Sequence, residues 1–173
     1  MKIIKKIFKF ICKCIFAYSF CGGLYLLIEM AFRQRTDLSM FFLAGFIGLF
    51  VMFFNNVFTY ETDYIIQIIV CTAYSTLIEG FVGNIINYDY HIWDYRNLPF
   101  SFWNSQINLM FIGCWMLIVA AIIPVLDYID WKLFDYLIDI PPYNKVFGKK
   151  IYQKLHKHMM KELFISMILI ILV

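Results

Sequence analysis

The chain has 173 residues, of which 62% are hydrophobic, 20% aromatic and only 16% charged. Soluble domains carry about 45–50% apolar and about 25% charged residues. No water-soluble fold of this length has an interior large enough for the excess, so the composition excludes a soluble globular protein. It predicts one all-α integral membrane domain over residues 1–173.

Four long apolar runs predict a bundle of transmembrane helices, at residues 14–32, 38–60, 64–86 and 107–126. At about 1.5 Å per residue, each run can cross about 30 Å of hydrocarbon. Residues 163–173 are too few to cross unaided, so they are either a short fifth span or an apolar tail on the membrane face. Residues 127–162 are expected to be cytoplasmic, with an interfacial helix near 127–136 followed by a basic stretch.

The net charge of +3 conceals a strong asymmetry, because lysines gather in two segments. Five lie in the first thirteen residues and seven lie between positions 132 and 161. The positive-inside rule keeps such segments in the cytoplasm. The N-terminus is therefore expected inside, as an uncleaved anchor, and four crossings return the chain to the same side. The hydropathy argues against nucleic acid as the partner of these lysines.

Small and polar side chains recur along one face of three predicted helices, where helices in lipid usually meet. We expect the three faces to pack against one another. They consist of Tyr18, Gly22, Tyr25 and Glu29; of Ala44, Gly45, Gly48, Met52 and Asn55; and of Thr72, Ser75, Thr76, Glu79 and Gly83.

Among the residues of these faces, Glu29 and Glu79 are the most unfavourable to place in a membrane. An ionisable residue in a span costs several kcal/mol of free energy unless it is paired, solvated or neutral. The topology puts both at the outer end of the bundle. Other charged residues are expected at the same depth, namely Arg33, Arg35, Asp94 and Arg96. Three interpretations stay open: an ion-pair cluster that locks helices and loop together, a pocket for a substrate, ion or proton, or simple hydration near the headgroups.

The loop after the third span is dense in aromatic residues, including Trp93 and Tyr95 on either side of Asp94. An aromatic belt at the membrane interface is one interpretation. The other is a re-entrant lid, with Pro99 fixing the chain and the Asp94 carboxylate reaching inward.

Enzymatic chemistry is not expected, because no nucleophile–base pair and no metal-ligand spacing is visible. Cys12 and Cys14 form a C-x-C pair without a second pair or nearby histidine, so no zinc site is predicted. We therefore expect no cofactor and no metal. The chain also has no G-x-x-x-x-G-K-[ST] phosphate loop.

Several strings occur together in one order. They are Gly22-Gly23-Leu24-Tyr25-Leu26-Leu27-Ile28-Glu29, Arg33, Ser39-Met40, Leu77-Ile78-Glu79-Gly80-Phe81-Val82-Gly83-Asn84 and Ile92-Trp93-Asp94-Tyr95-Arg96-Asn97-Leu98-Pro99-Phe100, with Gln106, Trp115, Asp127 and Pro142-Tyr143 beyond them. In these residues the chain resembles the ABC-transporter type IV family of small bacterial membrane proteins, also described as ABC transporter permeases. The resemblance covers roughly residues 22–143. It implies a bacterial cytoplasmic membrane and transport, with ATP hydrolysis supplied by a separate subunit.

The predicted function is thus a membrane subunit of a permease-like transporter, with an unspecified substrate. Its polar cluster would consist of Glu29, Glu79, Asp94, Arg33, Arg96, Trp93 and Tyr95. A single copy makes a thin bundle, so a homo-oligomer or a partner is expected in the bilayer. The alternative is a non-transporting scaffold or a holin-like pore-former, in which the same residues only hold helices together.

Overall fold

The computed structural model describes residues 2–57, 62–129, 131–132, 144–147 and 149–151, and helices dominate it. The helices are α1 (Lys2–Arg33), α2 (Leu38–Val57), α3 (Tyr64–Ile86) and α4 (Leu109–Ile129). Two short antiparallel ribbons accompany them, β1 (Ser101–Phe102) with β2 (Ile107–Asn108) and β3 (Asn144–Val146) with β4 (Lys149–Ile151). This architecture confirms the predicted all-α membrane protein.

Three of these helices, α1, α3 and α4, are long and apolar enough to cross a membrane. The described side chains of α2 form a shorter apolar helix, Leu38–Phe54. The 20 residues of α2 nevertheless extend about 30 Å, the thickness of the hydrocarbon. The predicted count of four crossings therefore stays a prediction, and the proposed fifth span at 163–173 lies outside the described residues.

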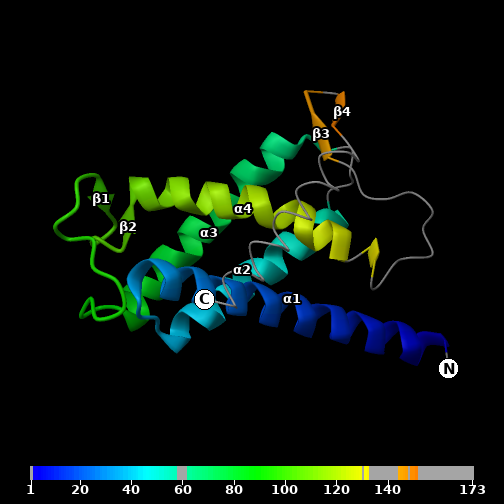
Figure 1. Ribbon diagram of the computed structural model, residues 1–173, viewed down its shortest axis with the longest axis horizontal. Coiled ribbons are helices and arrows are strands. Elements are labelled where there is room, and N and C mark those ends of the chain that lie inside the picture. The colour runs from blue at the N-terminus through cyan, green and yellow to red at the C-terminus, as the bar shows by residue number, and fades with distance from the viewer. Residues whose placement is uncertain (1, 58–61, 130, 133–143, 148, 152–173) are drawn as a thin grey trace.

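The basic start of the chain is part of α1, which begins at Lys2 rather than near residue 14. Its 32 residues extend about 48 Å, more than the bilayer core can enclose. The lysine-rich end therefore projects beyond the bundle, at the end opposite β1 and β2 (Figure 1).

Helix α4 differs from the predicted span at both ends. It starts at Leu109 because Asn108 belongs to β2 and accepts a hydrogen bond from Met110 N at 2.9 Å, as an N-cap residue does. It continues to Ile129, so that Asp127 is buried in its last turn instead of opening an interfacial helix. The rest of that predicted helix lies outside the described residues, apart from 131–132.

Pro124 lies inside α4 without ending it. A proline has no N–H to donate to the carbonyl four residues earlier, which here belongs to Ala120. The Tyr64 hydroxyl, at the start of α3, donates to that Ala120 carbonyl oxygen. A neighbouring helix thus satisfies the group that the proline leaves free, as an apolar environment requires.

Helices α1 and α2 pack through their glycines. A Cβ atom on Gly48 would lie 2.4 Å from Cys21 Sγ, and one on Gly22 would lie 2.6 Å from the Phe41 carbonyl oxygen. No larger residue fits at this separation, so the small faces of these two helices meet as predicted. The glycines of α3 differ. They face the loop that follows α3, where Trp103 and Trp93 fill the space beside them.

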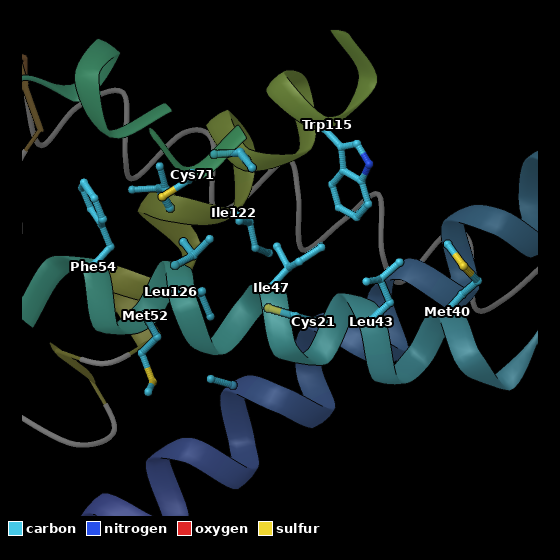
Figure 2. Close-up of a cluster of buried hydrophobic side chains, with 14 of the residues drawn as sticks. Cys21, Met40, Leu43, Ile47, Met52, Phe54, Cys71, Trp115, Ile122 and Leu126 are labelled. Carbon is cyan, nitrogen blue, oxygen red and sulfur yellow. The ribbon is translucent and has the colours of Figure 1, made fainter. Parts of the chain in front are cut away.

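The buried apolar core lies around α2. Figure 2 shows Leu43 and Ile47 of α2 between Cys21 of α1 and Trp115 and Ile122 of α4. A small cavity of about 30 Å³ remains between α1, α2 and α4. Its lining includes Cys21, Tyr25, Ala44, Gly48, Trp115 and Ile122.

Residues 87–108 form a compact cap over the end of the bundle opposite the N-terminus of α1 (Figure 1). Three fully buried amides hold this cap, namely Asn87, Gln106 and Asn108. Asn87 Nδ2 donates to the Trp93 carbonyl at 2.7 Å and to Gln106 Oε1 at 3.0 Å. Gln106 Nε2 donates back to the Asn87 carbonyl at 3.0 Å, and Asn108 Nδ2 to the Pro99 carbonyl at 2.7 Å. The cap is therefore a rigid platform for the side chains that it points into the bundle.

Candidate functional site

Two carboxylates are buried near the cap, one on α1 and one on α3. Glu29 is 5% exposed and lies one turn before the end of α1. Glu79 is 3% exposed and lies two turns before the end of α3. Both predicted intramembrane acids are thus inside the protein, but they have different partners.

Glu29 is part of an ion pair that ties α1 to the cap. Its Oε1 lies 2.5 Å from Arg33 Nη1, one turn further along the same helix. Arg33 Nη2 donates to the Ile92 carbonyl of the cap at 2.9 Å, and the Thr36 hydroxyl donates to Glu29 Oε2. Each Glu29 oxygen has a strong donor, and the arginine joins two elements. This group has the geometry of a structural lock.

Glu79 is held by neutral donors. Trp115 Nε1 of α4 donates to Oε2 at 2.7 Å, and the Tyr95 hydroxyl of the cap donates to Oε1 at 3.2 Å. Within the part of the chain that the structure describes, no lysine, arginine or histidine forms an ion pair with Glu79. Arg33, which the sequence predicts in the same cluster, pairs with Glu29 and donates to the Ile92 carbonyl instead.

Aromatic rings support both donors to Glu79. Tyr25 of α1 stacks on Trp115, with the ring centroids 5.4 Å apart and the planes at 19°. Phe111 of α4 stacks on Tyr95, with centroids at 4.6 Å and planes at 20°. Such offset stacking fixes ring orientation and contributes about 0.5–1.5 kcal/mol per pair. The carboxylate is therefore enclosed by rings from three elements.

The Tyr95 hydroxyl keeps its proton. Burial and the negative charge of Glu79 raise the pKa of Tyr95 far above its ordinary value. The hydroxyl is therefore a permanent donor to the carboxylate over the physiological pH range, and it links the cap to α3.

Asp94 lies outside this site, which corrects the expectation of an inward carboxylate. Trp93 and Tyr95 point into the protein, whereas Asp94 and Arg96 are exposed. Arg96 Nε and Nη2 donate to the two Asp94 oxygens at 2.9 and 2.7 Å. These bonds lower the pKa of Asp94 to about 2. From Trp93 to Arg96 buried and exposed residues alternate, and the Asp94 carboxylate lies on the exposed side.

Trp93 anchors the cap and does not reach Glu79. It is 3% exposed, and its Nε1 donates to the Gln106 carbonyl at 3.1 Å. Its ring lies against Gly83, where a Cβ atom would approach to 2.8 Å. Arg35, which the sequence placed at the same depth, is exposed.

Trp115 and the three buried amides of the cap were absent from the predicted cluster. Tyr25 was expected on the same face as Glu29 but had no assigned role. The role of Trp115 could have been predicted from the sequence, because an indole N–H inside a span needs a hydrogen-bond acceptor. The sequence carries little signal for the amides, because Asn87 and Gln106 lie just beyond the apolar runs and Asn108 is the second residue of the run 107–126, where polar residues are ordinary.

No family model, curated protein or solved structure matches this chain. Transport and the family resemblance therefore stay predictions. Among the described residues, no three His, Cys, Asp or Glu side chains are grouped as a metal site would require.

Proposed function

We propose that this chain is the membrane subunit of a permease-like transporter and that Glu79 lies at its substrate site. The observation that carries the proposal is the state of Glu79: 3% exposed, hydrogen-bonded by Trp115 and Tyr95, and without an ion pair in the described chain. Acidic residues inside membranes are expensive, and they usually mark a substrate, ion or proton pathway. Glu29 differs from Glu79, because it forms an ion pair with Arg33, as a buried acid with a purely structural role would.

This arrangement suits a site at which ligand binding is coupled to the conformation of the helices and the cap. Glu79 belongs to α3, Trp115 to α4 and Tyr95 to the cap. A ligand that pairs with the carboxylate changes the balance of both hydrogen bonds. A ligand can shift a conformational equilibrium only through such differential contacts.

The proposal includes a setting and an orientation. We place the protein in a bacterial cytoplasmic membrane, with the N-terminus inside and the cap outside. The lysines at the start of α1 support this orientation, since they project at the end opposite the cap. A separate subunit supplies ATP hydrolysis.

A non-transporting scaffold or pore-former is the second candidate. The Glu29–Arg33–Ile92 lock favours it, because this lock shows that intramembrane charge in this chain can serve structure alone. Exposed Ile3, Ile7 and Phe8 on α1 offer a surface for assembly.

Purification of the intact complex from native membranes in mild detergent separates the candidates. We expect an ATP-hydrolysing subunit in fixed stoichiometry, and we expect Glu79→Gln to alter ATP hydrolysis by the reconstituted complex. Asp94→Asn, the same change at an exposed site, should leave hydrolysis unchanged. A chain that purifies as a homo-oligomer without an ATPase and conducts ions in liposomes would establish the pore instead.

A further inference from the structure

Exposed aromatic side chains gather on the ribbon of β1 and β2, which lies in the cap beside the start of α4 (Figure 1). Phe100, just before β1, is 76% exposed. Phe102 in β1 and Trp103 in the turn after it are exposed as well. A contiguous exposed apolar surface commonly marks a site of interaction with a protein or with a membrane. The surroundings of the ribbon decide between these two partners.

The turn between β1 and β2 lies beside the last two turns of α3. A Cβ atom on Gly80 would lie 2.5 Å from Trp103 Cε3, and Asn104 Nδ2 donates to Asn84 Oδ1 at 2.7 Å. Gly80 precedes Ile86, the last residue of α3, by six positions, which correspond to about 9 Å along the helix. Helix α3 is long and apolar enough to cross a membrane. Trp103 therefore lies at the depth of this helix and not beyond its end.

The ribbon joins the exposed apolar surfaces of α3 and α4. On one side, the Trp103 ring packs edge to face on Phe81 of α3, with the centroids 5.7 Å apart, and Phe81 is itself exposed. On the other side, the backbone N–H of Leu109, the first residue of α4, donates to the Phe100 carbonyl at 3.2 Å. Leu109 and Met110 are exposed too. The apolar surface is thus continuous from one membrane helix, through the ribbon, to the other.

The charge and hydrogen bonding of the ribbon also suit lipid. Residues 97–126 include no Asp, Glu, Lys or Arg, whereas the exposed Asp94–Arg96 pair comes just before them. Ser101 Oγ donates to the Tyr95 carbonyl at 2.7 Å, and Asn108 Nδ2 donates to Ser101 Oγ at 2.9 Å. A segment that leaves water needs such internal partners for its polar groups. Trp side chains, moreover, are enriched at the level of the lipid headgroups.

We propose that residues 100–105 insert into the membrane interface at the cap end of the bundle and anchor the cap to phospholipid. Their aromatic rings lie between the headgroups and the upper acyl chains, while Asp94 and Arg96 stay in water. The anchor is connected to the rest of the cap, because Gln106 N donates to the Trp103 carbonyl at 3.1 Å and Gln106 Oε1 accepts from Asn87. This inference goes beyond the proposed function, since it holds whether or not the chain transports a substrate.

Tryptophan fluorescence of the full chain in phosphatidylcholine nanodiscs tests the proposal. Phe100→Trp adds an indole to the ribbon, and Asp94→Trp, the matched control, adds one to the charged segment of the cap. Subtracting the wild-type signal isolates the added indole in each variant. The quenchers are phosphatidylcholine brominated near the glycerol end of its acyl chains, phosphatidylcholine brominated near the terminal methyl, and iodide in the water. We expect the first lipid to quench at least half of the added fluorescence at position 100, and the second lipid and iodide to quench less. At position 94 only iodide should quench.

Trp103→Phe gives an independent measurement, because it removes a native indole from the same ribbon and keeps an aromatic ring against Gly80. The fraction of fluorescence that the shallow bromine quenches should fall in this variant, and it decides the question if Phe100→Trp does not fold. Quenching of the ribbon by iodide and not by lipid would overturn the proposal in favour of a loop in water. Protection from all three quenchers would overturn it in favour of a protein partner, such as a second copy of this chain. Strongest quenching by the deep bromine would also contradict a position at the interface.

Discussion

Trp115 Nε1 donates to Glu79 Oε2 at 2.7 Å, and this bond joins α4 to α3 inside the bundle. Both groups are almost fully buried. An indole N–H and a carboxylate each lose water on burial, and each here replaces part of that loss with the other. The bond therefore stabilises the helix pair, and no residue in the described part of the chain forms an ion pair with Glu79. This difference from the Glu29–Arg33 pair is the basis of the functional proposal.

The Tyr64 hydroxyl matters because of Pro124. We expect Tyr64→Phe to lower the free energy of unfolding by about 1–3 kcal/mol, since it leaves the buried Ala120 carbonyl without a donor. In a Pro124→Ala background the alanine N–H can donate to Ala120, so the same change should cost much less. A double-mutant cycle from denaturation in mixed micelles measures the coupling. Equal costs in the two backgrounds would contradict the account of the proline.

Gly83 is required by the contact between α3 and the cap. A Cβ atom there would lie 2.6 Å from Gln106 Oε1 and 2.8 Å from Trp93 Cζ2, and hydrogen bonds fix both side chains. Gly83→Ala should therefore destabilise the protein by about 1–3 kcal/mol. Gly113→Ala is the matched control, because nothing lies within 4 Å of its added Cβ. It should raise the melting temperature slightly through helix propensity. Similar effects of the two changes would refute this packing.

The sequence predicts the membrane helices and the burial of Glu29 and Glu79, because long apolar runs have few other solutions in lipid. It does not predict which of the two acids forms an ion pair with Arg33. Arg33 follows Glu29 by one helical turn, a local relationship, whereas the partners of Glu79 come from α4 and the cap. It also leaves the direction of Asp94 open, since neighbouring residues of a loop can lie on either side, and the burial of Trp93 and Tyr95 decides that Asp94 is exposed.

Arg33 should be essential for the lock between α1 and the cap. Arg33→Gln removes the charge that neutralises Glu29 and weakens the bond to the Ile92 carbonyl. We expect a loss of about 2 kcal/mol, less than for a fully buried pair because the Arg33 side chain is 34% exposed. Arg35→Gln, at an exposed arginine two residues away, should change stability by less than about 0.5 kcal/mol. Thermal unfolding of the two variants in one detergent compares them directly.

The Asp94–Arg96 pair should give the cap an acid-sensitive contribution to stability. The pKa of Asp94 is about 2 in the folded protein, against an ordinary value of 3.8. A lowered pKa stabilises the folded state above the unfolded value, and this stabilisation is lost as pH falls through the folded value. The melting temperature of wild type should therefore exceed that of Asp94→Asn by a constant amount from pH 7 to about 5. The difference should shrink between about pH 4 and 2. A difference that already disappears above pH 5 would contradict the assignment.

The most direct test of the central claim is ATP hydrolysis by the reconstituted complex that contains Glu79→Gln, measured on protein that elutes as a single folded species in gel filtration. If Glu79 serves a ligand, the variant elutes and melts like wild type but ATP hydrolysis by the complex is altered, whereas Asp94→Asn leaves it unchanged. A variant that fails to fold, or one that folds and supports wild-type ATP hydrolysis, would contradict the claim.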